Sequence, residues 1–259
     1  QAGGVLYAST GLGTRNQFGE QESGLLKLLG LKSADMKKNL YHLRPLLELP
    51  LAEPIDTITM DVRWSSPEDA AGEEVRSIVG AKIDAIALRQ KLTPAGERTK
   101  VIGRWKDGTP AVTVRAHGQG KAFAVGTAVG ATYLKTGLRP LPWARGGDVN
   151  LYNPTQFSSA ATALLRLGLD AADVPRQVMC SNPHVEALLL DNKAGTLVTL
   201  VNWTNEKHLG QLKVRVKMKA APSEVYSVAN QQKLDATFAD GEIVFSTNLD
   251  AADYVMLKK

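Results

Sequence analysis

Short stretches in which apolar residues alternate with polar ones, or run together, are spread along the whole chain. Such stretches, when bounded by Gly, Pro, Asn or Asp, are typical of β-strands. Asp107 and Gly108 also predict a tight hairpin turn between two of these stretches. In the first half of the chain the pattern predicts strands at residues 3–9, 55–60, 83–88, 99–105, 111–115 and 122–127.

Two segments have the spacing of a helix instead. The first covers residues 24–29, where Gly30 is well placed to end it. The second covers residues 158–167, with Ser158 or Ser159 as N-cap and Gly168 near its end. Outside the predicted strands and helices the pattern is less regular. It predicts a short helix near Leu40 within residues 33–54, a long loop over 136–154, and a linker over 170–183.

After Pro183 the pattern is almost wholly β. Strands are predicted at residues 185–190, 196–203, 212–218, 224–228, 243–246 and 253–257. Several short strands at this spacing favour an Ig-like antiparallel β-sandwich. We therefore expect an α/β plus all-β chain, with an α/β domain at 1–175 and a β-sandwich domain at 183–259.

Composition narrows the class of protein. Of the 259 residues, 44% are hydrophobic, which excludes wholesale disorder, and no apolar run approaches the length of a membrane helix. The single cysteine excludes a disulfide framework and a cysteine-rich zinc site. The four histidines are scattered without zinc-site spacing, so we expect no metal and no cofactor.

The net charge of +5 is mild for this length. The densest basic stretch, residues 212–219, alternates apolar and basic residues, as a half-buried strand does. We interpret its lysines as a solvated face that also discourages edge pairing. The alternative is contact with an acidic glycan or another polyanion. We expect no nucleic-acid partner and no membrane association.

Two further features are candidates for ligand binding or catalysis. The glycine-rich turn at residues 10–14 precedes Arg15, which either clamps a carboxylate or forms a surface ion pair. The turn lacks the complete dinucleotide-binding spacing, so we interpret its glycines as permitting a tight turn. Cys180 lies four residues before His184, but no nucleophile elbow surrounds it. We interpret it as an inert thiol rather than half of a catalytic dyad.

Exposed aromatic rings are the usual platform for sugars, because sugar C–H faces pack against them. Trp143 lies in the predicted long loop, with Tyr152 nearby, and both are candidate ligand contacts together with Arg15. Trp203 falls in a predicted strand, and we expect it in the core.

Several segments resemble a known family. Residues 3–7 with the glycine-rich turn, Arg15 and residues 28–30 are one such segment, and residues 118–126 are another. They resemble the C-terminal half of a class I glutamine-amidotransferase-like domain, in the form found as the trimerisation domain of large bacterial β-galactosidases. The tail, at residues 195–204 and 249–255, resembles the small β-sandwich that follows that domain in the family.

The resemblance implies a partial flavodoxin-like α/β domain with added hairpins, beginning mid-domain at Gln1. It implies that an upstream segment or companion chain completes the domain, and that the chain forms a homo-oligomer. In this family the catalytic carboxylates belong to a barrel, so no catalytic residue is carried over.

The predicted role is therefore a non-catalytic assembly or accessory region of a glycoside-hydrolase-like bacterial protein. The alternatives are a carbohydrate-binding module, and a hydrolase whose active site another segment or chain completes. A periplasmic or extracellular location is favoured over the cytoplasm.

Overall fold

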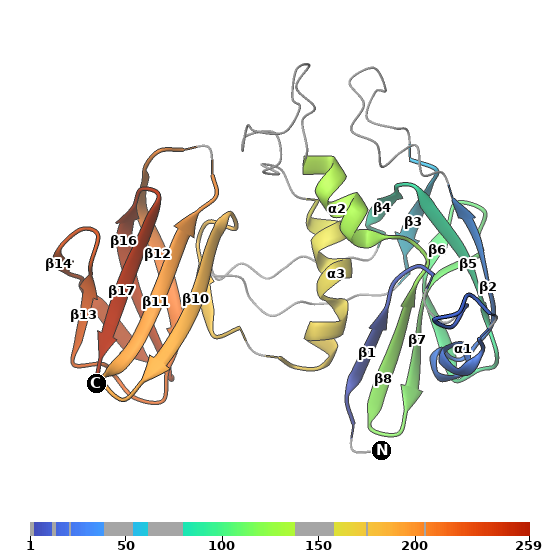
Figure 1. Cartoon of the computed structure of the whole chain (residues 1–259), viewed down its shortest axis with the longest axis horizontal. Coiled ribbons are helices and arrows are strands. Elements are labelled where there is room, and N and C mark those ends of the chain that lie inside the picture. The colour runs from blue at the N-terminus through green and yellow to red at the C-terminus, as the bar shows by residue number, and fades with distance from the viewer. Residues whose placement is uncertain are drawn as a thin grey trace. The chain divides into compact units, whose positions relative to one another are not determined.

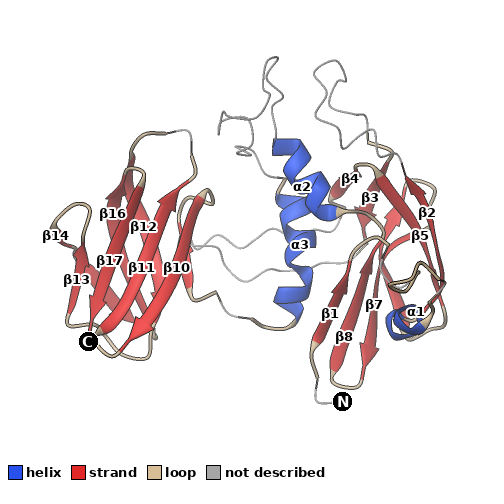
Figure 2. Cartoon of the chain, in the orientation of Figure 1, coloured by secondary structure: helices blue, strands red, loops and turns tan. Residues whose placement is uncertain are grey.

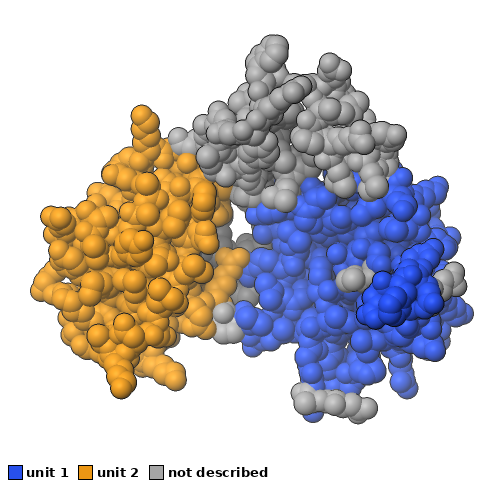
Figure 3. Space-filling model, in the orientation of Figure 1, with its two compact units in different colours: residues 1–66, 76–174 blue, residues 67–75, 175–259 orange. Residues whose placement is uncertain are grey.

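The computed structural model describes residues 3–11, 14–20, 22–38, 54–61, 80–137, 158–174, 176–204 and 206–259. The described residues up to Val174 form one compact unit, and those from Arg176 onward form a second (Figure 3). Strands dominate the secondary structure of both units (Figure 2), so the β-rich character expected from the sequence is confirmed. No helix in these ranges has the length and apolar character that spanning a membrane would require.

The first unit contains eight strands and three helices in its described part (Figure 1). In chain order they are β1 (Val5–Ala8), α1 (Gly24–Leu29), β2 (Leu31–Lys38), β3 (Asp56–Met60), β4 (Lys82–Ala85), β5 (Leu88–Pro94), β6 (Thr99–Trp105), β7 (Pro110–His117), β8 (Gly120–Val125), α2 (Val129–Gly137) and α3 (Ser159–Ala171). Six strands form one sheet in the order β1-β8-β7-β6-β3-β4, and β2 pairs with β5 in a separate ribbon. Only β1 and β8 are parallel in the six-stranded sheet.

Strand β8 is buried on both of its faces. Phe123 and Val125 belong to a core that includes Leu164 and Leu167 of α3. Ala122 and Ala124 point to the opposite face, where the core includes Leu29, Leu31 and Leu92. Small side chains on this second face let the β2–β5 ribbon and α1 approach the sheet closely. Alternation along one strand thus places protein on both sides of the sheet.

The predicted helix boundaries hold at three of four ends. Gly30 ends α1 in the left-handed conformation (φ 71°), and the Ser158 side chain accepts a hydrogen bond from the Ala161 N–H at the start of α3. Gly168 does not end α3, which continues to Ala171. A Cβ at Gly168 would lie 3.0 Å from the Cβ of Tyr7, so this glycine permits close packing of the helix against β1.

Several elements differ from the sequence-based expectation. Strands β2 and β5 and helix α2 were not anticipated, and residues 178–180 form a strand where a linker was predicted. The short helix predicted near Leu40 and most of the predicted 136–154 loop lie outside the described residues. The predicted strands near residues 3–9, 55–60, 99–105, 111–115 and 122–127 are confirmed, including the hairpin turn at Asp107 and Gly108.

The second unit is an antiparallel β-sandwich. Its elements are β9 (Val178–Cys180), β10 (Val185–Asn192), β11 (Gly195–Asn202), β12 (Leu209–Lys217), β13 (Glu224–Ser227), β14 (Gln232–Lys233), β15 (Ala236–Ala239), β16 (Glu242–Leu249) and β17 (Ala252–Lys258). One sheet has the order β10-β11-β17-β13-β14 and the other β15-β16-β12-β9. Alternate residues from both sheets, such as Val198, Val214, Phe245 and Val255, form a single core between them.

The basic stretch is the half-buried strand that the sequence predicted. Val214 and Val216 of β12 are buried, while Lys213 and Lys217 are exposed. Its lysines do not protect a sheet edge, however, because β12 lies between β16 and β9.

Candidate functional site

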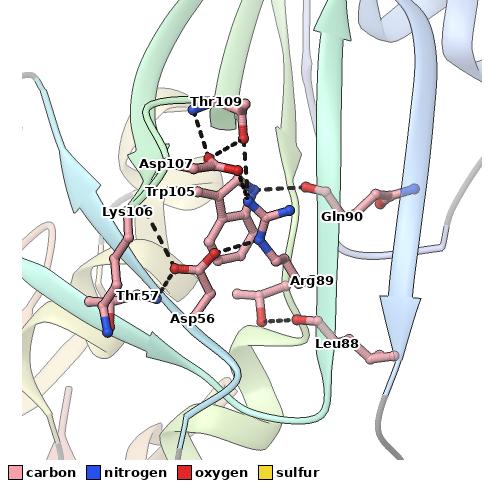
Figure 4. Close-up of polar contacts among 10 residues, drawn as sticks. Asp56, Thr57, Leu88, Arg89, Gln90, Trp105, Lys106, Asp107 and Thr109 are labelled. Atoms are coloured by element: carbon pink, nitrogen blue, oxygen red, sulfur yellow. Dashed lines mark hydrogen bonds and ion pairs between the residues drawn. The ribbon is translucent and has the colours of Figure 1, made fainter.

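A cluster of polar side chains surrounds Arg89, at the start of β5 (Figure 4). Its Nε donates to Asp56 Oδ2 at 2.5 Å, and its Nη2 donates to Asp107 Oδ2 at 2.6 Å. The guanidinium also lies over the ring of Trp105, 5.0 Å from the ring centroid. Arg89 therefore joins three separate segments, namely β3, β5 and the turn between β6 and β7.

Trp105, the aromatic partner of Arg89, is also held by hydrogen bonding. Trp105 is buried, and its indole N–H donates to the Gln90 carbonyl at 3.0 Å. The Gln90 side chain in turn donates to the Ala34 carbonyl at 2.9 Å and accepts from the Gly11 N–H at 3.2 Å. A chain of hydrogen bonds thus runs from the six-stranded sheet to the β2–β5 ribbon.

The chemistry of this cluster favours an ionised carboxylate. The Thr109 hydroxyl and N–H both donate to Asp107, and together with Arg89 they lower the pKa of Asp107 from 3.8 to about 2. A general acid needs the opposite shift, toward a carboxyl that keeps its proton near neutral pH. The bonds from Arg89 to Asp56 and Asp107 thus hold separate segments together.

Replacing Thr109 with valine should raise the pKa of Asp107 toward 3.8 without reaching it. The hydroxyl donor is lost, while the Thr109 N–H and Arg89 remain. Because the folded-state pKa lies below the unfolded one, Asp107 stabilises the fold above about pH 3.8, and this contribution is lost as the pH falls toward 2.

The variant should therefore lose less stability on acidification than the wild type. Titration of the Asp107 carboxyl by NMR measures the pKa directly. Thr57→Val is the matched control, because the Thr57 hydroxyl bonds to Asp84 and not to Asp107. An unchanged Asp107 pKa in Thr109→Val would contradict the assignment.

The single thiol does not have the properties of a nucleophile. Cys180 lies on β9 and is half-buried, and desolvation raises its pKa to about 11. A catalytic cysteine needs a lowered pKa, because the thiolate is the attacking species. The interpretation of Cys180 as an inert thiol is therefore supported. Among the described residues, no three His, Cys, Asp or Glu side chains are grouped so as to hold a metal ion.

A second candidate surface lies on the solvent-facing side of the five-stranded sheet in the sandwich. Trp203, which we expected in the core, is 46% exposed there. Its indole N–H donates to Glu186 Oε2 at 2.8 Å, and its backbone N–H donates to the His184 carbonyl at 3.0 Å. Trp203 follows β11 directly, and the buried residues of that strand are Thr196, Val198 and Leu200, so the odd-numbered positions face solvent.

The sequence signal for Trp203 was ambiguous for a physical reason. Both faces of β11 are apolar, because Leu197 and Val201 alternate with Val198 and Leu200. A strand that is apolar on both faces does not reveal which face is covered. The terminal Asn202 gives no help either, since its amide donates to two backbone carbonyls in neighbouring turns.

The predicted ligand contacts are not brought together by the described structure. Arg15 is exposed, and its guanidinium donates to the Gly19 carbonyl within its own loop. Trp143 and Tyr152 lie outside the described residues. Their proposed role in ligand contact stays a prediction.

Comparison with known proteins gives a fold and no family. No protein-family model matches the sequence, and no curated protein matches it. Solved structures do match. Gan42B, a GH42 β-galactosidase from G. stearothermophilus, superposes with a TM-score of 0.57 at 13% identity, over 99% of this chain and 28% of its own.

Two further structures agree. The β-galactosidase of Bacillus circulans sp. alkalophilus gives a TM-score of 0.55 at 12% identity, over 98% of this chain and 29% of its own. The α-L-fucosidase isoenzyme 2 of Paenibacillus thiaminolyticus gives 0.50 at 13% identity, over 98% of this chain and 40% of its own. The similarity is one of fold. The chain spans well under half of each of these structures, and the predicted resemblance to a part of β-galactosidases is confirmed at that level.

Proposed function

We propose that this chain is a non-catalytic region of a glycoside-hydrolase-type protein and that it serves in assembly. The observation that carries the proposal is the fold, which over 98–99% of the chain matches 28–29% of two β-galactosidase chains. The acids that meet in the first unit, Asp56 and Asp107, are both bonded to Arg89. Glycoside hydrolysis instead needs a carboxylic acid with a raised pKa beside a second carboxylate. The proposal therefore assigns the reaction to another part of a larger protein.

The first unit, in this proposal, is part of a flavodoxin-like, amidotransferase-like α/β domain with added hairpins. The parallel pair of β1 and β8 supports it, as do the cores on both faces of the sheet. Strand β1 lies at the edge of the six-stranded sheet. A further strand from an upstream segment or a companion chain would add to this edge and complete the domain.

Carbohydrate binding is the second candidate function, and the exposure of Trp203 favours it. The indole ring is held on the surface by Glu186, whose carboxylate would also accept hydrogen bonds from sugar hydroxyls. Trp143 and Tyr152 are the further contacts that the sequence suggests. The adjoining aliphatic side chains Leu188 and Leu190 are less suited to a sugar than to a protein surface.

One set of measurements tests the role. The purified chain should release no product from aryl β-galactosides or aryl α-L-fucosides, and light scattering should give the mass of an oligomer of the 27.9 kDa chain. Turnover that disappears on replacement of a single carboxylate would overturn the non-catalytic role. A monomeric mass at every concentration would overturn the assembly role. Calorimetric glycan binding that is lost in Trp203→Ala would favour the carbohydrate-binding alternative.

A further inference from the structure

The solvent-facing side of the five-stranded sheet carries a group of large apolar side chains, which we call the outer face. Leu188 is 58% exposed, Leu190 59% and Tyr254 52%. The strand register brings them together, because Leu188 and Tyr254 both lie opposite Thr199, and Leu190 and Met256 both lie opposite Leu197. Interface cores are rich in such aromatic, methionine and aliphatic residues, and exposed apolar groups of this kind often mark contact surfaces.

Strand β10, which carries the two leucines, is also an edge of the sheet among the described strands. Proteins usually protect edges with short strands, lysines or prolines, because an edge offers unpaired backbone groups to another chain. The other three edges of the sandwich are short, since β14 has two residues, β9 three and β15 four. In contrast β10 has eight residues and contains no lysine, arginine or proline. Among the described strands of the sandwich, β10 is therefore the edge most open to pairing.

We propose that two copies of this chain pair through β10 in an antiparallel, twofold arrangement. The inference rests on the proposed assembly role and names its surface. Antiparallel pairing of identical strands is self-complementary, as a twofold interface must be. It would join the two five-stranded sheets into one and satisfy the outward backbone groups of both edges.

The sequence of β10 favours one register, centred on Leu189. In that register Leu188 lies opposite Leu190 of the second copy, and this pair occurs twice, so all four exposed leucines are matched. Glu186 lies opposite Asn192 and Asp191 opposite Ala187, so neither acid faces its own copy. A shift by two residues in either direction keeps one leucine pair and leaves an acid facing a leucine.

Charged substitutions at the two leucines test the interface. The double variant with Leu188→Lys and Leu190→Lys places like charges opposite one another, and its dimer dissociation constant should rise by about tenfold or more. The variant with Leu188→Glu and Leu190→Glu should be equally impaired. An equimolar mixture of the two should form a heterodimer, as sedimentation velocity would show. Leu169→Lys is the matched control, because Leu169 is 56% exposed on α3 of the other unit.

The outcomes are separable from those of the proposed function. Restored dimerisation in the mixture supports the interface. It also excludes misfolding as the reason why each double variant alone fails to dimerise. A wild-type oligomer that both double variants preserve overturns this interface and leaves the assembly role in place. A monomeric wild type overturns both.

A disulfide test fixes the register. Under mild oxidation, Leu188→Cys protein mixed with Leu190→Cys protein should form a cross-linked dimer, while neither protein should do so alone. The wild type, which carries Cys180, provides the background in the same assay. Cross-linking of either variant with itself would overturn the register centred on Leu189.

Discussion

Replacing Gly126 with alanine should destabilise the first unit by about 3 kcal/mol, the upper part of the range for overpacking a filled site. A Cβ there would lie 2.3 Å from the Gln90 carbonyl oxygen and 3.0 Å from the Ala111 carbonyl oxygen. Both obstacles are backbone atoms, which cannot move aside as the end of a flexible side chain can. The Gly126 N–H donates to Ala111, and the Gly126 carbonyl accepts from the Gln90 N–H, so relaxation would also break the local pairing.

The same substitution should disturb the Arg89 cluster. The Gln90 carbonyl that a new methyl group would displace is the acceptor for the Trp105 indole N–H. Trp105 in turn lies beneath the Arg89 guanidinium. Loss of this geometry adds to the clash, since each hydrogen bond contributes about 1 kcal/mol.

Urea unfolding followed by circular dichroism, together with hydrogen exchange of the first unit, would measure the effect. Gly130→Ala is the matched control. Gly130 lies in helix α2 with open space around its Cα, so alanine should stabilise the unit by about 0.5–1 kcal/mol through helix propensity. Equal stabilities for the two variants would contradict the close packing described at Gly126.

The sequence identified the strands whose hydrophobic pattern is strong, and it failed where few core residues hold an element in place. The eight residues of β2 contribute one fully buried residue, Leu31, and the rest are charged, polar, half-buried or, in the case of Met36, exposed. Ribbon pairing with β5 stabilises this strand, and such a long-range contact leaves little periodic signal. Helix α2 was missed because glycine and β-branched residues lower its propensity. It is fixed by tertiary contacts, including the bond from the Thr132 hydroxyl to the Asp84 carbonyl.

The candidate surfaces follow the same rule. The sequence spacing of Asp56, Arg89 and Asp107 does not predict a cluster, because the three residues are brought together only when the sheet and the ribbon pack. The exposure of Trp203 depends on which face of β11 the second sheet covers. Burial of the opposite face by Val214 and Phe245 settles that choice, and both residues lie on other strands. Local pattern predicts elements, while long-range pairing decides which side chains reach the surface.

The carboxylate of Asp253 is a buried acidic group in the sandwich. It is 1% exposed and has no cation partner in the described structure, but it accepts several hydrogen bonds. Its Oδ1 accepts from the Ala229 N–H at 2.9 Å and from its neighbouring Tyr254 N–H at 2.7 Å. Its Oδ2 accepts from the Ser227 hydroxyl at 2.5 Å and from the Asn230 side-chain amide at 3.4 Å. Asp253 thus ties the end of β13 and the turn that follows it to β17.

Replacing Asp253 with alanine should therefore destabilise the sandwich by about 3 kcal/mol or more. The loss leaves two backbone N–H groups and a buried hydroxyl without their acceptor, and hydrogen bonds to a charged group contribute about 1.5–3 kcal/mol each. Asp253→Asn should fall between the wild type and the alanine variant, because it keeps one acceptor oxygen for the two N–H groups.

Thermal and urea unfolding of the second unit would rank these variants. The control is Asp250→Ala, three residues away in the sequence, where the carboxylate is 77% exposed and, among the side chains that the structure describes, contacts the exposed ring of His208. An exposed pair of this kind contributes little to stability, so this variant should unfold at the same temperature and urea concentration as the wild type. If the two alanine variants instead unfolded together, burial and directed hydrogen bonding would not be what makes Asp253 important. The order Asp250→Ala, Asp253→Asn, Asp253→Ala in decreasing stability would show that the sandwich is stabilised by an acceptor inside its sheet and not by charge on its surface.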